Sequence, residues 1–251
     1  MTDLFSLDDR VAIVTGASSG LGTRMARALH DAGAHVVVAA RRVDRLQALA
    51  DELLNALPVA CDVANDDDLD QLVDAAMTRY GRIDVLVNNA GIGEPIAAVD
   101  ESVDAFRQTI AVNLTGTFAL CQKAGVHMLA AGKGSIINVA SVLGLVGAGM
   151  FASASYASSK GAVVQLTRDL AAQWARGGVR VNALAPGWFE TEMTADMFAD
   201  EKAMTLVRRK TPMGRAGVEG ELDGALIYFA SDASSFVTGQ VLAVDGGWTA
   251  I

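Results

Sequence analysis

Cysteine and histidine are scarce in this sequence, and their spacing suits neither a disulfide framework nor a metal site. The two cysteines, Cys61 and Cys121, lie far apart with no Cys-x-x-Cys pattern, and the three histidines lack the spacing of metal ligands. These patterns argue against a disulfide framework and a structural metal site, so we expect no metal ion. Reduced cysteines are typical of the cytoplasm, and we expect a cytoplasmic protein.

Basic residues are in the minority and form no block. The chain has 20 Lys and Arg against 29 Asp and Glu, with a net charge of -9. A surface that follows phosphates needs clustered cations, so we expect no nucleic-acid partner. Residues 134–159 carry no charge and are long enough to cross a bilayer. Asn138, Ser141 and Tyr156 interrupt this stretch, however, so we interpret it as a strand, a loop and a helix start, and expect no membrane partner.

Aromatic residues make up only 6% of the 251 residues, whereas hydrophobic residues as a group make up 51%. A core of small and branched aliphatic residues is typical of buried parallel strands covered by helices. Strand patterns alternate with helical ones. The strands are expected at 10–15, 35–39, 57–61, 83–87, 135–139, 179–183 and 240–244, and the helices at 20–32, 43–56, 66–80, 103–130, 155–175 and 219–230. This order predicts an α/β fold, a Rossmann-type doubly wound parallel sheet with helices on both faces, in one domain over 1–251.

A glycine-rich turn follows the first strand and opens the first helix. Its glycines are Gly16, Gly20 and Gly22, with Ser18, Ser19 and Leu21 between them. Glycines there let the backbone approach a pyrophosphate, which binds the helix N-terminus. Some glycine-rich turns only pack, but the strand–turn–helix context favours dinucleotide binding.

The end of the second strand distinguishes NADP from NAD. A carboxylate at this point would bind the ribose 2′-hydroxyl, whereas an arginine accommodates a 2′-phosphate. The sequence reads Ala39-Ala40-Arg41-Arg42 with no acid. We therefore expect NADP, with NAD as the second option. The alternative is that Arg41 and Arg42 only begin a helix in solvent.

Tyr156 and Lys160 lie four residues apart in a helical pattern, and thus on one face. A nearby cation favours the phenolate, so we expect Lys160 to lower the pKa of Tyr156. A tyrosine adjusted in this way can act as general acid or base toward a carbonyl or an alcohol. A plain surface pair is the alternative for these two residues taken alone.

With these motifs the chain resembles the short-chain dehydrogenase/reductase family over essentially its whole length. The matching elements are Thr15–Gly22, Asp62, Asn88-Asn89-Ala90-Gly91, Asn113, Ser141, Tyr156-x-x-x-Lys160, Pro186-Gly187-x-x-x-Thr191 and Val244-Asp245-Gly246-Gly247. The resemblance implies an NAD(P)-dependent oxidoreductase that transfers hydride between nicotinamide C4 and a ketone or secondary alcohol.

The resemblance also implies a role for each matching residue. Tyr156 would exchange the proton, Lys160 would lower the pKa of Tyr156 and bind the nicotinamide ribose, Ser141 would bind the substrate oxygen, and Asn113 would hold a water in a relay with Lys160. The cofactor would further contact Asp62, with its neighbour Val63, at the adenine, and Asn89, Ala90 and Gly91 at the adenosine ribose. Thr191, after Pro186 and Gly187, would hold the nicotinamide amide or the pyrophosphate.

The substrate region is the least patterned part. The interval from Ser141 to Tyr156 is slightly longer than is common in the family, with an insertion expected within 147–153, so Ser153 is an alternative to Ser141. Residues 188–215 are expected to form a mobile lid, and its Met and aromatic residues suit apolar shapes. About half of them should instead pack on the core.

The end motifs resemble those of gluconate 5-dehydrogenases, which implies a small carbonyl or alcohol substrate such as the sugar acid 5-keto-gluconate. Two alternatives stay open: a 3-oxoacyl thioester reductase, and a nucleotide-sensing binding protein without turnover. Helices rich in small residues on several faces, and an apolar C-terminal segment at 240–251, indicate burial against another subunit. The resemblance implies a homotetramer with two-fold axes.

Overall fold

One parallel sheet of seven strands organises the chain. The computed structural model describes residues 4–147, 149 and 151–251. The strands are β1 (Val11–Thr15), β2 (His35–Ala40), β3 (Leu57–Ala60), β4 (Val85–Asn88), β5 (Gly134–Val139), β6 (Val179–Pro186) and β7 (Val241–Val244), in the order β3-β2-β1-β4-β5-β6-β7. Every pairing is parallel, as the alternation of patterns predicts.

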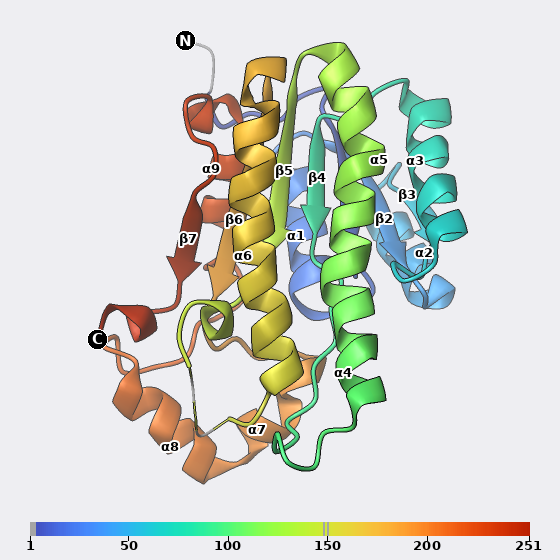
Figure 1. Ribbon diagram of the computed structural model, residues 1–251. Coiled ribbons are helices and arrows are strands. Elements are labelled where there is room, and N and C mark those ends of the chain that lie inside the picture. Colours follow the sequence, from blue (N-terminus) through green and yellow to red (C-terminus); the bar gives the residue numbers. More distant parts are fainter. Residues whose placement is uncertain (1–3, 148, 150) are drawn as a thin grey trace.

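Helices cover both faces of this sheet (Figure 1). Along β1, Ala12 and Val14 belong to one apolar cluster, while Val11 and Ile13 belong to the other. One face is covered by α1 (Gly20–Asp31), α2 (Val43–Glu52) and α9 (Asp223–Ala230), and the other by α3 (Asp66–Tyr80), α5 (Gly116–Ala131) and α6 (Ala154–Trp174). Because both faces are buried, the strands are continuous apolar runs rather than alternating ones.

Three of the predicted helices differ from the structure by more than one residue. The helix expected to reach residue 56 ends at Glu52, because Leu54 and Asn55 adopt positive φ angles of 33° and 82°. The helix expected from residue 219 begins at Asp223. The long helix expected over 103–130 consists of α4 (Val103–Ile110), a π-helical turn, η1 (Ala111–Thr115), and α5.

The order of the strands creates a crevice at their carboxyl ends. The chain proceeds from β1 outward to β3, then returns to the other side of β1 and proceeds outward again from β4 to β7. Open parallel sheets bind ligands at such a reversal, because the connections on either side diverge there.

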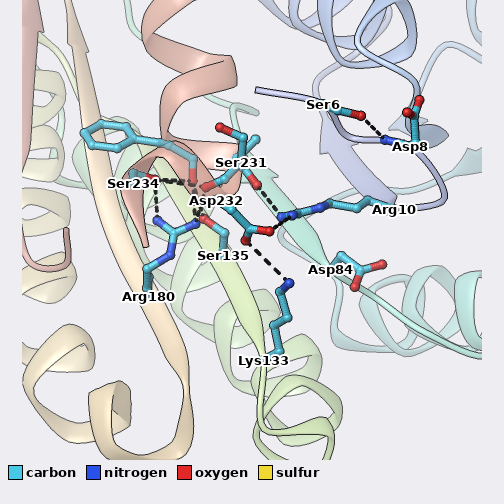
Figure 2. A network of polar contacts seen from close by, with 12 residues as sticks. Ser6, Asp8, Arg10, Asp84, Lys133, Ser135, Arg180, Ser231, Asp232 and Ser234 are labelled. Atoms are coloured by element: carbon cyan, nitrogen blue, oxygen red, sulfur yellow. Dashed lines mark hydrogen bonds and ion pairs between the residues drawn. The ribbon is translucent and has the colours of Figure 1, made fainter. Parts of the chain in front are cut away.

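The opposite end of the sheet is held by a polar network (Figure 2). Arg10 and Lys133 both reach the carboxylate of Asp232, at 2.6 Å and 3.4 Å. Arg180, at the start of β6, donates to the Ser234 hydroxyl at 2.7 Å and to the carbonyl oxygen of Phe229 at 2.9 Å. These contacts fasten the segment after α9 to the amino ends of the central strands.

The segment after β6 extends beyond the carboxyl ends of the strands. It contains η4 (Glu192–Thr194), α7 (Ala195–Ala199) and α8 (Glu201–Lys210), which lie at the lower end of the molecule in Figure 1. Trp188 and Met204 are buried in a small apolar cluster with Trp248, whereas Met193 is half exposed. Part of this segment is thus a packed layer, as expected. No helix among the described residues is long and apolar enough to cross a membrane.

Candidate active site

A cavity of about 500 Å³ opens at the carboxyl ends of the strands. It is lined by the glycine turn, the ends of β2 and β4 to β6, α6 and the start of the segment after β6. Every residue predicted to bind the cofactor lines it, and so does Ser141: Gly16, Ser18, Ser19, Gly20, Leu21, Gly22, Arg41, Arg42, Asp62, Val63, Asn89, Ala90, Gly91, Tyr156, Lys160, Pro186, Gly187 and Thr191. Of the predicted residues, Asn113 alone is not among the described lining residues.

The glycine turn leaves the N-terminus of α1 open to this cavity. Gly16 has a φ of 65°, and a Cβ at Gly22 would lie 2.2 Å from the carbonyl oxygen of Gly16. Larger side chains at these points would fill the turn. The Ser19 hydroxyl does not cap α1 but accepts a hydrogen bond from Arg42 at 2.7 Å. The turn therefore offers backbone N–H groups to an anion such as a pyrophosphate.

Asn89 braces this turn from the end of β4. Its side-chain amide donates to the carbonyl oxygen of Thr15 at 2.9 Å, and its backbone N–H donates to the Thr15 hydroxyl at 3.1 Å. The backbone N–H of Ala90 donates to the same hydroxyl at 3.0 Å. The two strands on either side of the crevice are thereby connected, a structural role beyond the predicted contact with the ribose.

The cavity has a basic end beside β2. Arg41 is largely exposed, and its nearest acidic partner is Asp62 at 3.9 Å. Arg42 donates to Ser18 at 3.2 Å and to Ser19. Two arginines and no carboxylate directly follow β2 in the sequence, and the planar donors of their guanidinium groups suit a phosphate.

Tyr156, Lys160 and Ser141 come together at the other end. The Lys160 side chain is buried, and its Nζ donates to the carbonyl oxygen of Val139 at 2.7 Å and lies 5.6 Å from the centre of the Tyr156 ring. Ser141 follows β5 and lines the cavity with Tyr156, and its hydroxyl accepts a hydrogen bond from the backbone N–H of Leu143 at 3.2 Å. The alternative residue Ser153 donates instead to the carbonyl oxygen of Phe151. Within the insertion, Ala148 and Met150 lie outside the described residues.

The pKa of Tyr156 moves in the direction opposite to the sequence expectation. Burial raises the pKa of Tyr156, and the hydrogen bond with Ser141 opposes this rise. Burial also lowers the pKa of Lys160 to about 8. The expected effect of Lys160 is absent in the described structure, because its ammonium is directed to a backbone carbonyl and the cation is itself desolvated.

Asn113 lies behind these residues in the π-helical turn. Its Oδ1 accepts from the backbone N–H of Ile92 at 2.8 Å, and its Nδ2 donates to the carbonyl oxygen of Ile92 at 2.8 Å and to the Ser159 hydroxyl at 3.0 Å. Both amide protons are thus engaged. Asn113 therefore connects Ile92, in the loop after β4, to Ser159 in α6. Ser159 directly precedes Lys160.

Several residues of the site escaped the sequence prediction. A Cβ at Gly93 would lie 2.5 Å from Cδ2 of Tyr156, and one at Gly144 would lie 2.6 Å from the backbone carbonyl carbon of Lys160. Both glycines let distant loops pack against α6. Further lining residues that were not predicted are Ile92, Gln108 and Val112, whereas Glu192 and Met193 belong to the expected lid. A lone glycine in a loop gives no signal of such a contact.

The geometry therefore provides a cavity for a dinucleotide with a tyrosine at one end. An open helix N-terminus, a basic end suited to phosphate, and Ser141 with Tyr156 line one continuous cavity. A tyrosine in this position can exchange a proton with an alcohol or carbonyl oxygen. The residues fit a nicotinamide cofactor in chemistry and in the space left by the glycines.

Comparison with known proteins agrees with this geometry. Residues 16–249 match the family model described as enoyl-(acyl carrier protein) reductase. The chain is 46% identical to the cis-4-hydroxycyclohexanecarboxylate dehydrogenase of Sinomonas cyclohexanicum, over 97% of this chain and 98% of that protein.

Two solved structures are similar throughout. A gluconate 5-dehydrogenase from Burkholderia cenocepacia, in complex with NADP and tartrate, has a TM-score of 0.94 and 40% identity, with 99% of this chain and 98% of that one covered. A short-chain type dehydrogenase/reductase from Mycobacterium marinum has a TM-score of 0.95 and 38% identity, with 99% of each chain covered. The fold, the site and these relatives together place the chain in the short-chain dehydrogenase/reductase family, as an oxidoreductase of CH–OH groups.

Proposed function

We propose that this protein catalyses reversible, NADP(H)-dependent oxidation of a secondary alcohol to a ketone. The observation that carries the proposal is that Ser141, Tyr156 and buried Lys160 line the same cavity as the glycine turn. A bound nicotinamide would accept or supply the hydride.

Tyr156 is the proposed general acid and base. In oxidation its phenolate oxygen takes the hydroxyl proton of the alcohol, and in reduction its phenol returns a proton to the ketone oxygen. Ser141 orients that oxygen by its hydroxyl. Lys160, which belongs to α6, would bind the nicotinamide ribose. Asn113, whose amide protons are engaged, supports a relay to Lys160 by positioning Ile92 and Ser159.

The cofactor assignment rests on the basic end of the cavity. Arg41 and Arg42 follow β2, where a carboxylate would favour NAD. The gluconate 5-dehydrogenase of similar structure was solved with NADP. We therefore propose NADP(H) as the preferred cofactor, with NAD(H) as the weaker one.

The proposed substrate is a hydroxy acid whose reacting hydroxyl is remote from its carboxylate. The names of the two similar dehydrogenases, for cis-4-hydroxycyclohexanecarboxylate and gluconate, both denote such acids. Ile92, Gln108, Val112 and Met193 also line the cavity, so these residues offer a substrate one amide and apolar contacts. We infer that a remote carboxylate would reach the mouth of the cavity and remain hydrated.

A panel assay with NADPH and NADH tests this function. The panel contains 5-keto-gluconate, 4-oxocyclohexanecarboxylate, a 3-oxoacyl thioester and a neutral cyclic ketone. Fastest turnover with the two keto acids and NADPH is expected. Fastest turnover of the thioester would favour the 3-oxoacyl alternative. A protein that binds NADPH but reduces no ketone would favour a nucleotide-sensing role.

We also propose that the protein is a single-domain homotetramer of the cytoplasm, with residues 188–215 as a lid. Phe118 and Val126 of α5 are 42% and 62% exposed, and Leu242 of the edge strand β7 is 38% exposed. An apolar helix face and an open strand edge are the surfaces that a second copy would cover. The buried thiols of both cysteines suit a reducing compartment.

A further inference from the structure

The basic end of the cavity contains a carboxylate that belongs to the segment after β6. Glu192 accepts a hydrogen bond from Nη1 of Arg42 at 2.9 Å and forms an ion pair with Arg45. Arg42 in turn donates to Ser18 and Ser19 of the glycine turn. Arg42 and Glu192 line the cavity, whereas Arg45 adjoins it through its ion pair with Glu192; the three side chains are 42%, 52% and 45% exposed.

The backbone around Glu192 is held in place. Thr191 and Thr194 form a capping box, with the Thr191 N–H donating to the Thr194 hydroxyl at 2.9 Å. Thr191 also lies directly over the glycine turn, since a Cβ at Gly20 would be 3.1 Å from Cβ of Thr191. Glu192 therefore meets the arginines because its segment is anchored there. The two arginine hydrogen bonds lower the pKa of Glu192 to about 2, so the carboxylate is ionised at neutral pH.

This carboxylate alters the charge that a ribose 2′-phosphate would meet. Arg41, Arg42 and Arg45 supply three positive charges, and Asp62 and Glu192 place two negative charges beside them. A guanidinium that already donates to a carboxylate must exchange that partner for the phosphate or share its donors. The same carboxylate has no such effect on a ribose 2′-hydroxyl, which carries no charge.

We propose that Glu192 is a cofactor-selecting residue, whose carboxylate competes with the 2′-phosphate of NADP(H) for Arg42 and Arg45 and so moderates the preference for NADP(H) over NAD(H). This inference rests on the proposed function, because it requires that a dinucleotide binds in the cavity. It assigns to the segment after β6 a part in reading the adenosine end of the cofactor. The alternative is that Glu192 only attaches this segment to the glycine turn.

The test compares Glu192→Gln with the parent and with Glu190→Gln. Glutamine keeps the shape of the side chain and an acceptor for arginine, so the segment stays attached while the negative charge is lost. Glu190 is an exposed neighbour that does not line the cavity, and its substitution is the matched control. Dissociation constants for NADPH, NADH and adenosine 2′,5′-bisphosphate are measured by calorimetry at low and high salt.

The expected result is that Glu192→Gln tightens NADPH and the bisphosphate by roughly 3- to 10-fold, with NADH unchanged within about twofold. The gain in affinity should be smaller at high salt, because exposed charges are screened. Glu190→Gln should leave the dissociation constants for both cofactors unchanged. Equal changes for NADPH and NADH, or no change, would overturn the inference and leave Glu192 as an attachment only. A parent that binds neither dinucleotide would instead refute the proposed function, and the inference with it.

Discussion

Burial acts on Tyr156 and Lys160 in opposite senses although they lie one turn apart on α6. It raises the pKa of the phenol and lowers the pKa of the ammonium to about 8, because the charged form of each is disfavoured. The sequence predicted that the two residues share a face, and the structure confirms this. It could not predict the direction of the phenol's pKa shift, which depends on how deeply the fold buries Tyr156.

Replacement of Tyr156 by Phe tests the proton transfer. The phenyl ring keeps the packing against the cavity wall but has no hydroxyl, so the turnover rate should fall by at least ~10²-fold. The dissociation constant for NADPH should stay within a few-fold of the parent value. Tyr80→Phe, which removes a hydroxyl that bonds to Asn55 far from the cavity, is the control and should keep full turnover. Near-parental activity of Tyr156→Phe would contradict the assignment.

The lowered pKa of Lys160 predicts a rise in stability with pH. Between pH 8 and the ordinary lysine value of 10.5, the unfolded chain binds a proton at this residue that the folded chain has released. Stability increases with pH wherever the unfolded state binds more protons, by on the order of 3 kcal/mol at most over this window. The raised pKa of Tyr156 acts only above its ordinary value of 10, and in the opposite direction.

Lys160→Met, which is neutral at every pH, should lack this rise. The measurement is the midpoint of thermal unfolding at pH 7.5 and 9.5 for the parent, for Lys160→Met and for Lys202→Met at an exposed position. The advantage of Lys160→Met over the parent should be largest at pH 7.5. The same difference at both pH values would show that Lys160 is not the titrating group.

At the scale of elements, most strands and helices follow from the spacing of apolar residues, while the exceptions arise from contacts with distant segments. The π-helical turn at 111–115 is an example. Its Asn113 is a weak helix former, which is visible in the sequence, but the hydrogen bonds to Ile92 and Ser159 come from other elements. The sequence thus singled out Asn113, but only the fold shows the hydrogen bonds that accompany the wider π-helical turn.

Gly93 lies in the loop after β4, and its hydrogen atom faces the ring of Tyr156. A Cβ there would be 2.5 Å from Cδ2 and 3.0 Å from Cγ of that ring, so Gly93→Ala must displace the tyrosine. We expect a loss of turnover of roughly 10- to 100-fold, because misplacement of a catalytic group by about 1 Å has costs of this order. The melting temperature should change little, since the loop is at the surface.

Gly224→Ala is the matched control, because a Cβ at that position of α9 meets no described atom within 4 Å. Steady-state kinetics and thermal unfolding of both variants check the prediction. Full activity of Gly93→Ala would mean that Tyr156 adjusts to the methyl group and that the close packing is not needed for catalysis.

At the scale of the whole molecule, the doubly wound parallel sheet with helices on both faces could be predicted, because alternating strands and helices admit few arrangements, but the order of the strands comes from the structure. The residues predicted to bind the cofactor do line the cavity, and they were visible in the sequence because most of their motifs follow strand ends. The substrate end was predicted only in part: Met193 belongs to the expected lid, whereas Gln108 and Val112 lie in the helical run of α4 and the π-helical turn, where nothing in the sequence distinguished them from their neighbours.

The exposed apolar positions on α5 and β7 predict an assembly larger than one chain. Light scattering at micromolar concentration should give about four times the monomer mass of 26.1 kDa. Val126→Glu, on α5, should dissociate part of this assembly, because a charge would be buried at the interface. Val99→Glu is the control, because Val99 lies in a loop and is 93% exposed. A monomer mass for the parent would contradict the proposed tetramer.

The two ends of the sheet have different roles: one is held by a polar network, and the other forms the cavity. The network of Arg10, Arg180 and Asp232 fastens one end, while the cavity and the segment 188–215 occupy the other. Mutations that change the substrate preference can therefore accumulate at the carboxyl end of the sheet without removing the polar network at the opposite end. A laboratory evolution experiment could exploit this separation by exchanging segment 188–215 among relatives, and retaining Trp188 and Glu192 would preserve its attachment to the recipient scaffold.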